Sequence, residues 1–132
     1  EAGQVVVLGG LGARGGPGVA SASWFAAAIH GAGLAGDIAV VTDGQLSGLN
    51  RGFVVGQVMP EAADGGPLAL VRDGDRVVVD LDERRLDLEV PAAELDKRRQ
   101  QLPAFEAQEK RGWLAIYQRL VRPLTKGGVL GP

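Results

Sequence analysis

The stretch Ile38-Ala39-Val40-Val41-Thr42-Asp43-Gly44-Gln45-Leu46-Ser47-Gly48 decides how this chain folds. Its first half is apolar, rich in β-branched residues and closed by Asp-Gly, which predicts a buried strand that ends in a turn. In sheets flanked by helices, ligands bind just beyond the carboxyl ends of strands, so Asp43 and Ser47 are candidates for chemistry. The same residues also form ordinary turns, because Asp and Ser bond nearby backbone and Gly tolerates positive φ. Local sequence alone favours the turn.

Upstream, Gln4–Leu8 is a second candidate strand that runs into a glycine-dense loop, residues 9–18. Gly10 to Gly15 fits G-x-G-x-x-G, the dinucleotide fingerprint. That fingerprint needs a helix to begin at its third glycine, so that helix amides face the pyrophosphate, but Gly-Pro-Gly follows here at once. We therefore expect the helix later, over residues 19–30, and keep a nucleotide-binding half-domain only as a weak alternative. His30, the single histidine, is interpreted as a helix-end residue.

The second half of the chain changes character. An apolar segment at 53–58 is followed by three short candidate strands at 68–71, 76–80 and 86–90, an antiparallel meander. Helices are predicted over 91–100 and 112–120, the last with Trp113, Ile116, Tyr117 and Leu120 on one apolar face. The basic residues between 97 and 126 fit a solvated helix face better than a single-strand nucleic-acid surface. We expect one domain over residues 1–125 and a flexible tail over 126–132.

Composition limits the classes of function. The 132 residues suffice for one core, and the absence of cysteine excludes disulfides, thiolate zinc sites and iron–sulfur clusters whose ligands come from this chain. A net charge of −2 gives no global footprint for nucleic acid or an anionic membrane, and no apolar run reaches the length of a membrane span. We therefore expect a cytoplasmic protein that binds neither. Because the chain begins at Glu1 without a methionine, we expect a piece of something longer.

Three blocks of sequence carry a resemblance to a known family. They are Arg14-Gly15-Gly16-Pro17-Gly18, then Thr42-Asp43-Gly44-Gln45-Leu46-Ser47-Gly48, then the run from Pro60-Glu61-Ala62-Ala63-Asp64-Gly65-Gly66-Pro67 to Asp73-Gly74-Asp75. In order and spacing they resemble the C-terminal domain of the dihydroxy-acid dehydratase and 6-phosphogluconate or sugar-acid dehydratase family. The resemblance covers nearly the whole chain, through Leu86-Asp87-Leu88-Glu89-Val90 to Tyr117. Each motif alone is weak, but three collinear motifs are specific.

The resemblance implies a mixed α/β fold, a swivelling β/β/α domain with a barrel-like sheet and flanking helices. It also implies a partner, a larger N-terminal domain that carries a [2Fe-2S] or [4Fe-4S] cluster and most ligands of Mg²⁺. Together the two domains would convert 2,3-dihydroxy or sugar acids to 2-keto acids, in branched-chain amino acid biosynthesis or sugar acid metabolism, and the intact enzyme would be a homodimer. This chain alone would bind no cofactor and have no activity.

The resemblance also assigns roles to residues. Ser47 matches the family's catalytic base, and the substrate-binding positions are Gly15, Gly16, Gly18, Asp43, Gly44 and Gly48. Three positions depart from the family pattern: Ser21 replaces a glutamate that binds the metal, Gln45 an arginine and Gln57 a histidine. No metal ligand is therefore expected in this chain. The departures motivate a second hypothesis, a non-catalytic descendant that binds a partner or a small acid.

Overall fold

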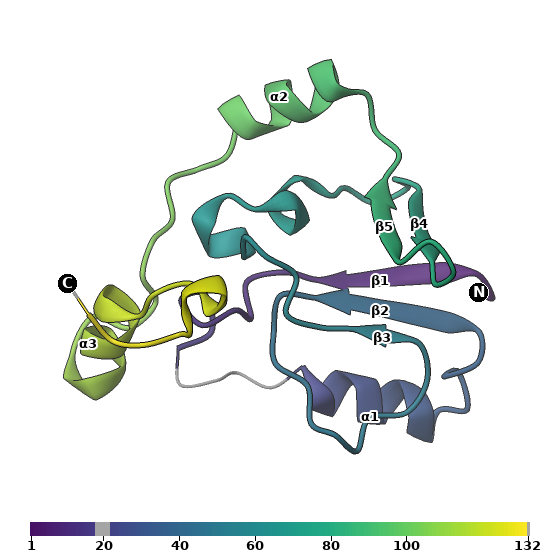
Figure 1. The fold of residues 1–132 in the computed structure, drawn as a ribbon, viewed down its shortest axis with the longest axis horizontal. Coiled ribbons are helices and arrows are strands. Elements are labelled where there is room, and N and C mark those ends of the chain that lie inside the picture. The colour runs from purple at the N-terminus through teal and green to yellow at the C-terminus, as the bar shows by residue number, and fades with distance from the viewer. Residues whose placement is uncertain (18–21, 132) are drawn as a thin grey trace.

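A parallel three-stranded sheet forms the centre of the fold in the computed structural model, which describes residues 1–17 and 22–131 (Figure 1). Its strands are β1 (Gln4–Leu8), β2 (Ile38–Thr42) and β3 (Val54–Val55), in the order β1-β2-β3. Leu8 lies opposite Thr42 in the register, so β1 and β2 end at the same edge. The two strands predicted around the glycine-rich loop are confirmed, because β-branched runs bounded by glycine define them clearly.

One helix lies along one side of this sheet (Figure 1). It is α1 (Ser23–Gly31), and Ala26 is its fully buried residue, with Ala22 buried just before it. The predicted helix at 19–30 is confirmed in its described part, while residues 19–21 lie outside the described residues. His30 lies in the last turn, as expected, near the negative end of the helix dipole.

A two-stranded antiparallel hairpin lies on the other side of the sheet (Figure 1). It consists of β4 (Val77–Asp80) and β5 (Arg85–Leu88). Val7 and Val41 of the parallel sheet share an apolar space of about 80 Å³ with Val77, Leu86 and Leu88 of the hairpin. The described residues therefore form a mixed α/β fold with a parallel sheet and a separate hairpin, which confirms the predicted α/β class.

The predicted barrel-like closure of the sheet is wrong. In the described residues the parallel sheet stays open and the hairpin strands pair only with each other. β3 is two residues long, and the chain then reaches Pro60, which has no N–H to donate to a ladder. Two 3₁₀ turns follow, η1 (Ala62–Asp64) and η2 (Pro67–Leu70), in place of a strand that could close the sheet.

The first strand of the predicted meander is also wrong, because η2 occupies residues 67–70. Pro67 fixes its φ for a turn, and the Ala69 N–H donates to the Gly66 carbonyl. Leu70 is buried, and its carbonyl accepts a hydrogen bond from the Arg98 guanidinium at 2.9 Å. A side chain 28 residues away thus takes the place of a strand partner.

The C-terminal helices are α2 (Ala92–Gln100) and α3 (Gly112–Leu120), both as predicted. The apolar face expected to bury α3 is only partly covered by the described residues. Trp113 is 66% exposed and Ile116 is 39% exposed, whereas Tyr117 and Leu120 are half-buried. The buried side chain of α3 is Gln118. After η3 (Leu124–Lys126) the chain folds back, and Val121 forms an antiparallel bridge with Leu130. None of the described helices is long and apolar enough to cross a membrane.

Candidate active site

The loops after β1 and β2 meet at the carboxyl edge of the sheet, and a buried carboxylate joins them. Asp43 follows β2 directly and is fully buried. Its oxygens accept hydrogen bonds from the N–H groups of Gly10 at 3.0 Å, Leu11 at 2.9 Å and Ala62 at 2.7 Å. Asp43 therefore binds the glycine-rich loop to the segment after Pro60.

A second buried carboxylate, Glu61, holds the next part of the glycine-rich loop. It is 1% exposed and accepts from the Arg14 N–H at 2.9 and 3.1 Å and from the Gly15 N–H at 2.8 Å. A Cβ at Gly12 would lie 2.3 Å from the Glu61 Oε2, so only glycine allows this approach. Sequence reasoning gave Glu61 no role, since its partners lie more than 45 positions away and leave no local signal.

These contacts change how the glycine-rich loop is interpreted. Four of its amides donate to protein carboxylates, and the Gly16 N–H donates to the Gly12 carbonyl at 2.8 Å. The amides that a pyrophosphate would need are thus already bonded, which disfavours the nucleotide alternative. Substrate contact by Gly15 and Gly16 stays a prediction and would involve the carbonyl and Cα surface of the loop. Gly18 and Ser21 lie outside the described residues.

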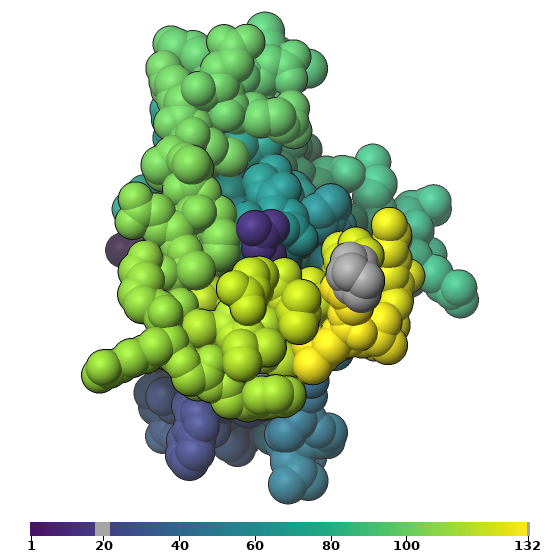
Figure 2. Space-filling model, turned by 90° about the vertical axis from the view of Figure 1, so that its left-hand side faces the viewer, coloured from purple at the N-terminus to yellow at the C-terminus, as the bar shows by residue number. Residues whose placement is uncertain are grey.

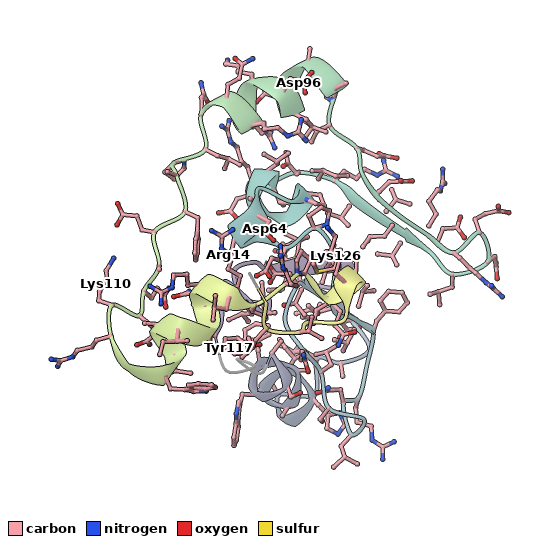
Figure 3. All side chains as sticks on the ribbon, turned by 60° about the vertical axis from the view of Figure 1, so that its left-hand side comes forward. Arg14, Asp64, Asp96, Lys110, Tyr117 and Lys126 are labelled. Atoms are coloured by element: carbon pink, nitrogen blue, oxygen red, sulfur yellow. The ribbon has the colours of Figure 1, made fainter. Side chains whose placement is uncertain are left out.

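The far C-terminal segments cover the same loop from the side. The Arg14 guanidinium pairs with Asp64 at 2.7 Å, as Figure 3 shows, and lies over the Phe105 ring at 5.0 Å. The Gln118 amide of α3 donates to the Arg14 carbonyl at 2.7 Å. A hollow of about 1030 Å³, lined among others by Gly15, Ala63 and Phe105, remains beside the loop. In Figure 2, residues near the N-terminus, coloured purple, are visible between the green and yellow segments of the C-terminal half.

Ser47 lies in the loop after β2 with a fixed backbone and an exposed side chain. Its N–H donates to the Ser23 hydroxyl at 2.8 Å, and its carbonyl accepts from the Asn50 amide at 2.7 Å. Asn50 also donates to the Ser23 hydroxyl at 3.2 Å. The Ser47 Oγ accepts from the Leu49 N–H at 3.3 Å, which leaves its other lone pair and its proton for a ligand.

An open hollow of about 400 Å³ surrounds this hydroxyl. Its lining combines the start of α1 with the loop after β2, and consists of Ser23, Trp24, Ala27, His30, Ser47, Leu49, Asn50 and Arg51. Trp24 is 82% exposed and Leu49 is 88% exposed, so two large apolar side chains flank the serine. His30, interpreted from sequence as a helix-end residue only, shares this hollow with Ser47, a proximity that sequence spacing does not reveal.

The other predicted site residues lie around these two loops. Gly44 is buried, and a Cβ there would approach Leu11 within 2.8 Å, whereas Gly48 is exposed with open space around it. Gln57 is exposed and has a φ of 57°. Gly15 and Ser47 line different hollows. The loops after β1 and β2 thus meet at one edge of the sheet through Asp43, but Gly15 and Ser47 lie in separate hollows.

The described residues do not bring together side chains that could ligate an iron–sulfur cluster or Mg²⁺. The sequence has no cysteine, and within residues 1–17 and 22–131 no three His, Asp or Glu side chains gather where they could hold an ion. The two buried carboxylates bind backbone amides instead. The chain therefore has no thiolate for a cluster, and its described residues offer no group of side chains that fits Mg²⁺.

The chain was compared with protein families. The family model described as "Dihydroxy-acid/6-phosphogluconate dehydratase C-terminal" matches residues 1–128. The match includes both loops at the carboxyl edge of the sheet, the hairpin and all three α-helices.

Proposed function

Because this chain belongs to the dihydroxy-acid/6-phosphogluconate dehydratase family as a C-terminal domain, we propose that it supplies the catalytic base of a hydro-lyase through Ser47. The family uses an iron–sulfur cluster and Mg²⁺, and a C-terminal domain implies association with an N-terminal dehydratase domain. The substrate class is a 2,3-dihydroxy or sugar acid, and the product is a 2-keto acid. The chain alone is inactive in this proposal.

The proposed step of this chain is proton removal at C2 of the substrate. The Ser47 Oγ, as alkoxide, takes the C2 proton, and the C2–H electron pair forms the C2=C3 double bond. The C3–O bond breaks, and the leaving hydroxide takes up the proton that Ser47 has gained, which gives water and restores the alkoxide. The enol then tautomerises to the 2-keto acid. Serine is a weak base in water, so this step requires a site shielded from solvent with stabilised negative charge.

The observation that carries the proposal is the geometry of Ser47. Two side chains, Ser23 and Asn50, fix its backbone, while its hydroxyl stays exposed. The Leu49 N–H donates to the Oγ, and such a bond favours the charged form of an oxygen. The exposed Trp24 and Leu49 beside it are suited to pack against the N-terminal domain and exclude water.

The test is Ser47→Ala in the intact parent enzyme. We expect kcat to fall by about 10³-fold or more, at the upper part of the range for general base catalysis, with KM nearly unchanged because the serine does not hold the ground state. The matched control is Thr125→Ala, which removes an exposed hydroxyl from η3 and should leave kcat unchanged. Equal activity of the Ser47→Ala and Thr125→Ala variants would refute the role of Ser47.

A second candidate is the non-catalytic descendant. It is favoured by Gln57, an exposed amide that cannot titrate, at a position where the family has a histidine. Gln45 stands where the family has an arginine, so its side chain brings no charge to the loop. Its backbone carbonyl accepts a hydrogen bond from the Ala22 N–H at 3.2 Å. A parent protein with its cluster loaded that dehydrates no 2,3-dihydroxy acid, with or without Ser47, would favour this second function.

A further inference from the structure

We propose that the outer face of α3 binds an acidic surface of the N-terminal dehydratase domain. This face consists of Trp113, Ile116 and Arg119, together with the basic residues that flank the helix. Membership of the family implies association with an N-terminal domain, but it does not say which surface of this chain that domain covers. The inference rests on this association, and its tests do not depend on the role of Ser47.

The segment that carries α3 holds basic side chains and no acidic ones. No Asp or Glu occurs in residues 110–132. The basic residues of this segment are all exposed, and they are Lys110, Arg111, Arg119, Arg122 and Lys126. Figure 3 shows Lys110 before α3 and Lys126 after it. Because the whole chain has a net charge of −2, the positive charge is a local property of this segment.

These cations are not neutralised within the described part of the chain. No carboxylate of residues 1–17 and 22–131 lies within 4.0 Å of any of them. The arginines that do form ion pairs lie elsewhere, and they are Arg14, Arg72, Arg76, Arg85, Arg98 and Arg99. Surfaces of opposite charge attract each other, and surfaces of like charge repel. The expected partner surface is therefore acidic.

Large apolar side chains lie among these charges. Trp113 and Ile116 are exposed, and together with Arg119 they follow the spacing i, i+3, i+6, which places them on one side of α3. In Figure 2 the yellow-green segment that includes α3 lies at the surface facing the viewer. Trp and Arg are enriched at the centres of protein interfaces. Aliphatic side chains such as Ile116 do not stack on bases, so this face suits a protein better than single-stranded nucleic acid.

The inner side of α3 connects this face to the candidate active site. Gln118 lies on the opposite side of the helix from Ile116 and is 2% exposed. Its amide donates to the Arg14 carbonyl at 2.7 Å, and the Arg14 N–H donates to the buried Glu61. The helix is therefore fixed beside the glycine-rich loop at the carboxyl edge of the sheet. A domain that covers this edge also lies next to the outer face of α3.

The first test is hydroxyl-radical footprinting, which labels exposed side chains, of the intact parent enzyme and of the 132-residue chain. We expect labelling of Trp113 and Ile116 to be lower in the parent by about fivefold or more, since side chains at the core of an interface lose contact with water. Leu81 in the β4–β5 turn is 69% exposed and serves as the internal control, whose labelling should not change. Unchanged labelling of Trp113 would overturn the proposal.

Charge reversal tests whether the partner surface is acidic. In the parent enzyme, Arg119→Glu should raise the labelling of Trp113 to its level in the isolated chain, because like charges would then face each other across the interface. The matched control is Arg84→Glu, which reverses an exposed arginine in the β4–β5 turn and should leave Trp113 protected. The same labelling of Trp113 in both variants would contradict an acidic partner. Thermal unfolding checks that both variants fold.

Carbodiimide cross-linking identifies the partner without any substitution. The reagent joins a lysine amine to a carboxylate that it contacts, so in the parent we expect Lys110 and Lys126 to be linked to Asp or Glu residues of the N-terminal domain. Links only to a second copy of this chain, or no links, would overturn the proposal. Binding of a single-stranded oligonucleotide that is lost in Arg119→Glu would also overturn it, since the face would then bind nucleic acid. If Ser47 proves not to be the base, these links still decide the interface.

Discussion

At the residue scale, the two buried carboxylates explain most of the site's framework. Asp43 was predicted to contact substrate, but its oxygens in this structure bind three backbone N–H groups. Glu61, quoted only as part of a family block, bonds the loop around Arg14 and Gly15. Residue type and position after a strand predicted that Asp43 matters. They could not distinguish a ligand from a structural acceptor, because the partners come from distant loops.

We predict that Glu61→Gln destabilises the domain by about 2 kcal/mol. The carboxylate has two oxygens that accept hydrogen bonds from the N–H groups of Arg14 and Gly15, whereas a carboxamide has only one acceptor oxygen. A buried N–H left without an acceptor costs about 1–3 kcal/mol. Urea unfolding measures the change. The matched control is Asp96→Asn, an exposed acid on α2 (Figure 3) whose pair with Arg99 is worth at most about 1 kcal/mol. If Glu61→Gln unfolds like the control, other contacts hold the loop.

At the element scale, one arginine joins α2 to the segment before the hairpin. Arg98 is nearly buried and binds Asp75, Glu94 at 3.0 Å and the Leu70 carbonyl at 2.9 Å. The hydrogen bond from Arg98 lowers the pKa of Asp75, which the Arg72 N–H lowers further. The same guanidinium lowers the pKa of Glu94, and the two carboxylates raise the pKa of Arg98.

This cluster predicts an acid-sensitive contribution to stability. A carboxyl whose folded pKa lies below its unfolded value, about 4, stabilises the fold fully above that value and loses the effect as pH falls through the lower folded pKa. We expect the free energy of unfolding to decline below about pH 4, and to decline less steeply in Asp75→Asn. Urea titrations between about pH 3 and pH 7 measure both. A decline of the same slope in the variant would exclude Asp75 as a source.

The elements predicted correctly are those with strong local signals. β1 and β2 are β-branched runs next to glycine, and α3 has the bounds that its periodicity indicates. The segment 68–71 was misassigned because distant Arg98 satisfies the backbone there. The periodicity of α3 predicted the helix, but it could not predict that Trp113 stays exposed to solvent in this chain.

At the scale of the whole molecule, the core of the fold is buried by this chain itself, whereas the candidate site around Ser47 is open to solvent. The parallel sheet supplies buried core residues from this chain itself, with Val40 and Val41 at 1% exposure. Ser47, by contrast, lies exposed in an open hollow, and the described residues hold no metal cluster beside it. The exposure of Ser47 accords with the association with an N-terminal dehydratase domain that membership of the family implies.

We accordingly predict that the chain folds without metal. Thermal unfolding of the 132-residue chain should give the same Tm in EDTA and in excess Mg²⁺, because a structural ion would add its binding energy to folding. A Tm that falls by many degrees on chelation, and recovers with one added cation, would show a metal site that the described residues lack.

Ser47 is proposed to remove the C2 proton of the substrate, and loss of label from C2 measures this step directly. The intact parent enzyme is given a 2,3-dihydroxy acid deuterated at C2, and deuterium release to water is followed in single turnovers. We predict release together with 2-keto acid formation in the wild type and in Thr125→Ala, and a rate at least about 10³-fold lower in Ser47→Ala. Release at the wild-type rate from the Ser47→Ala enzyme would contradict the account.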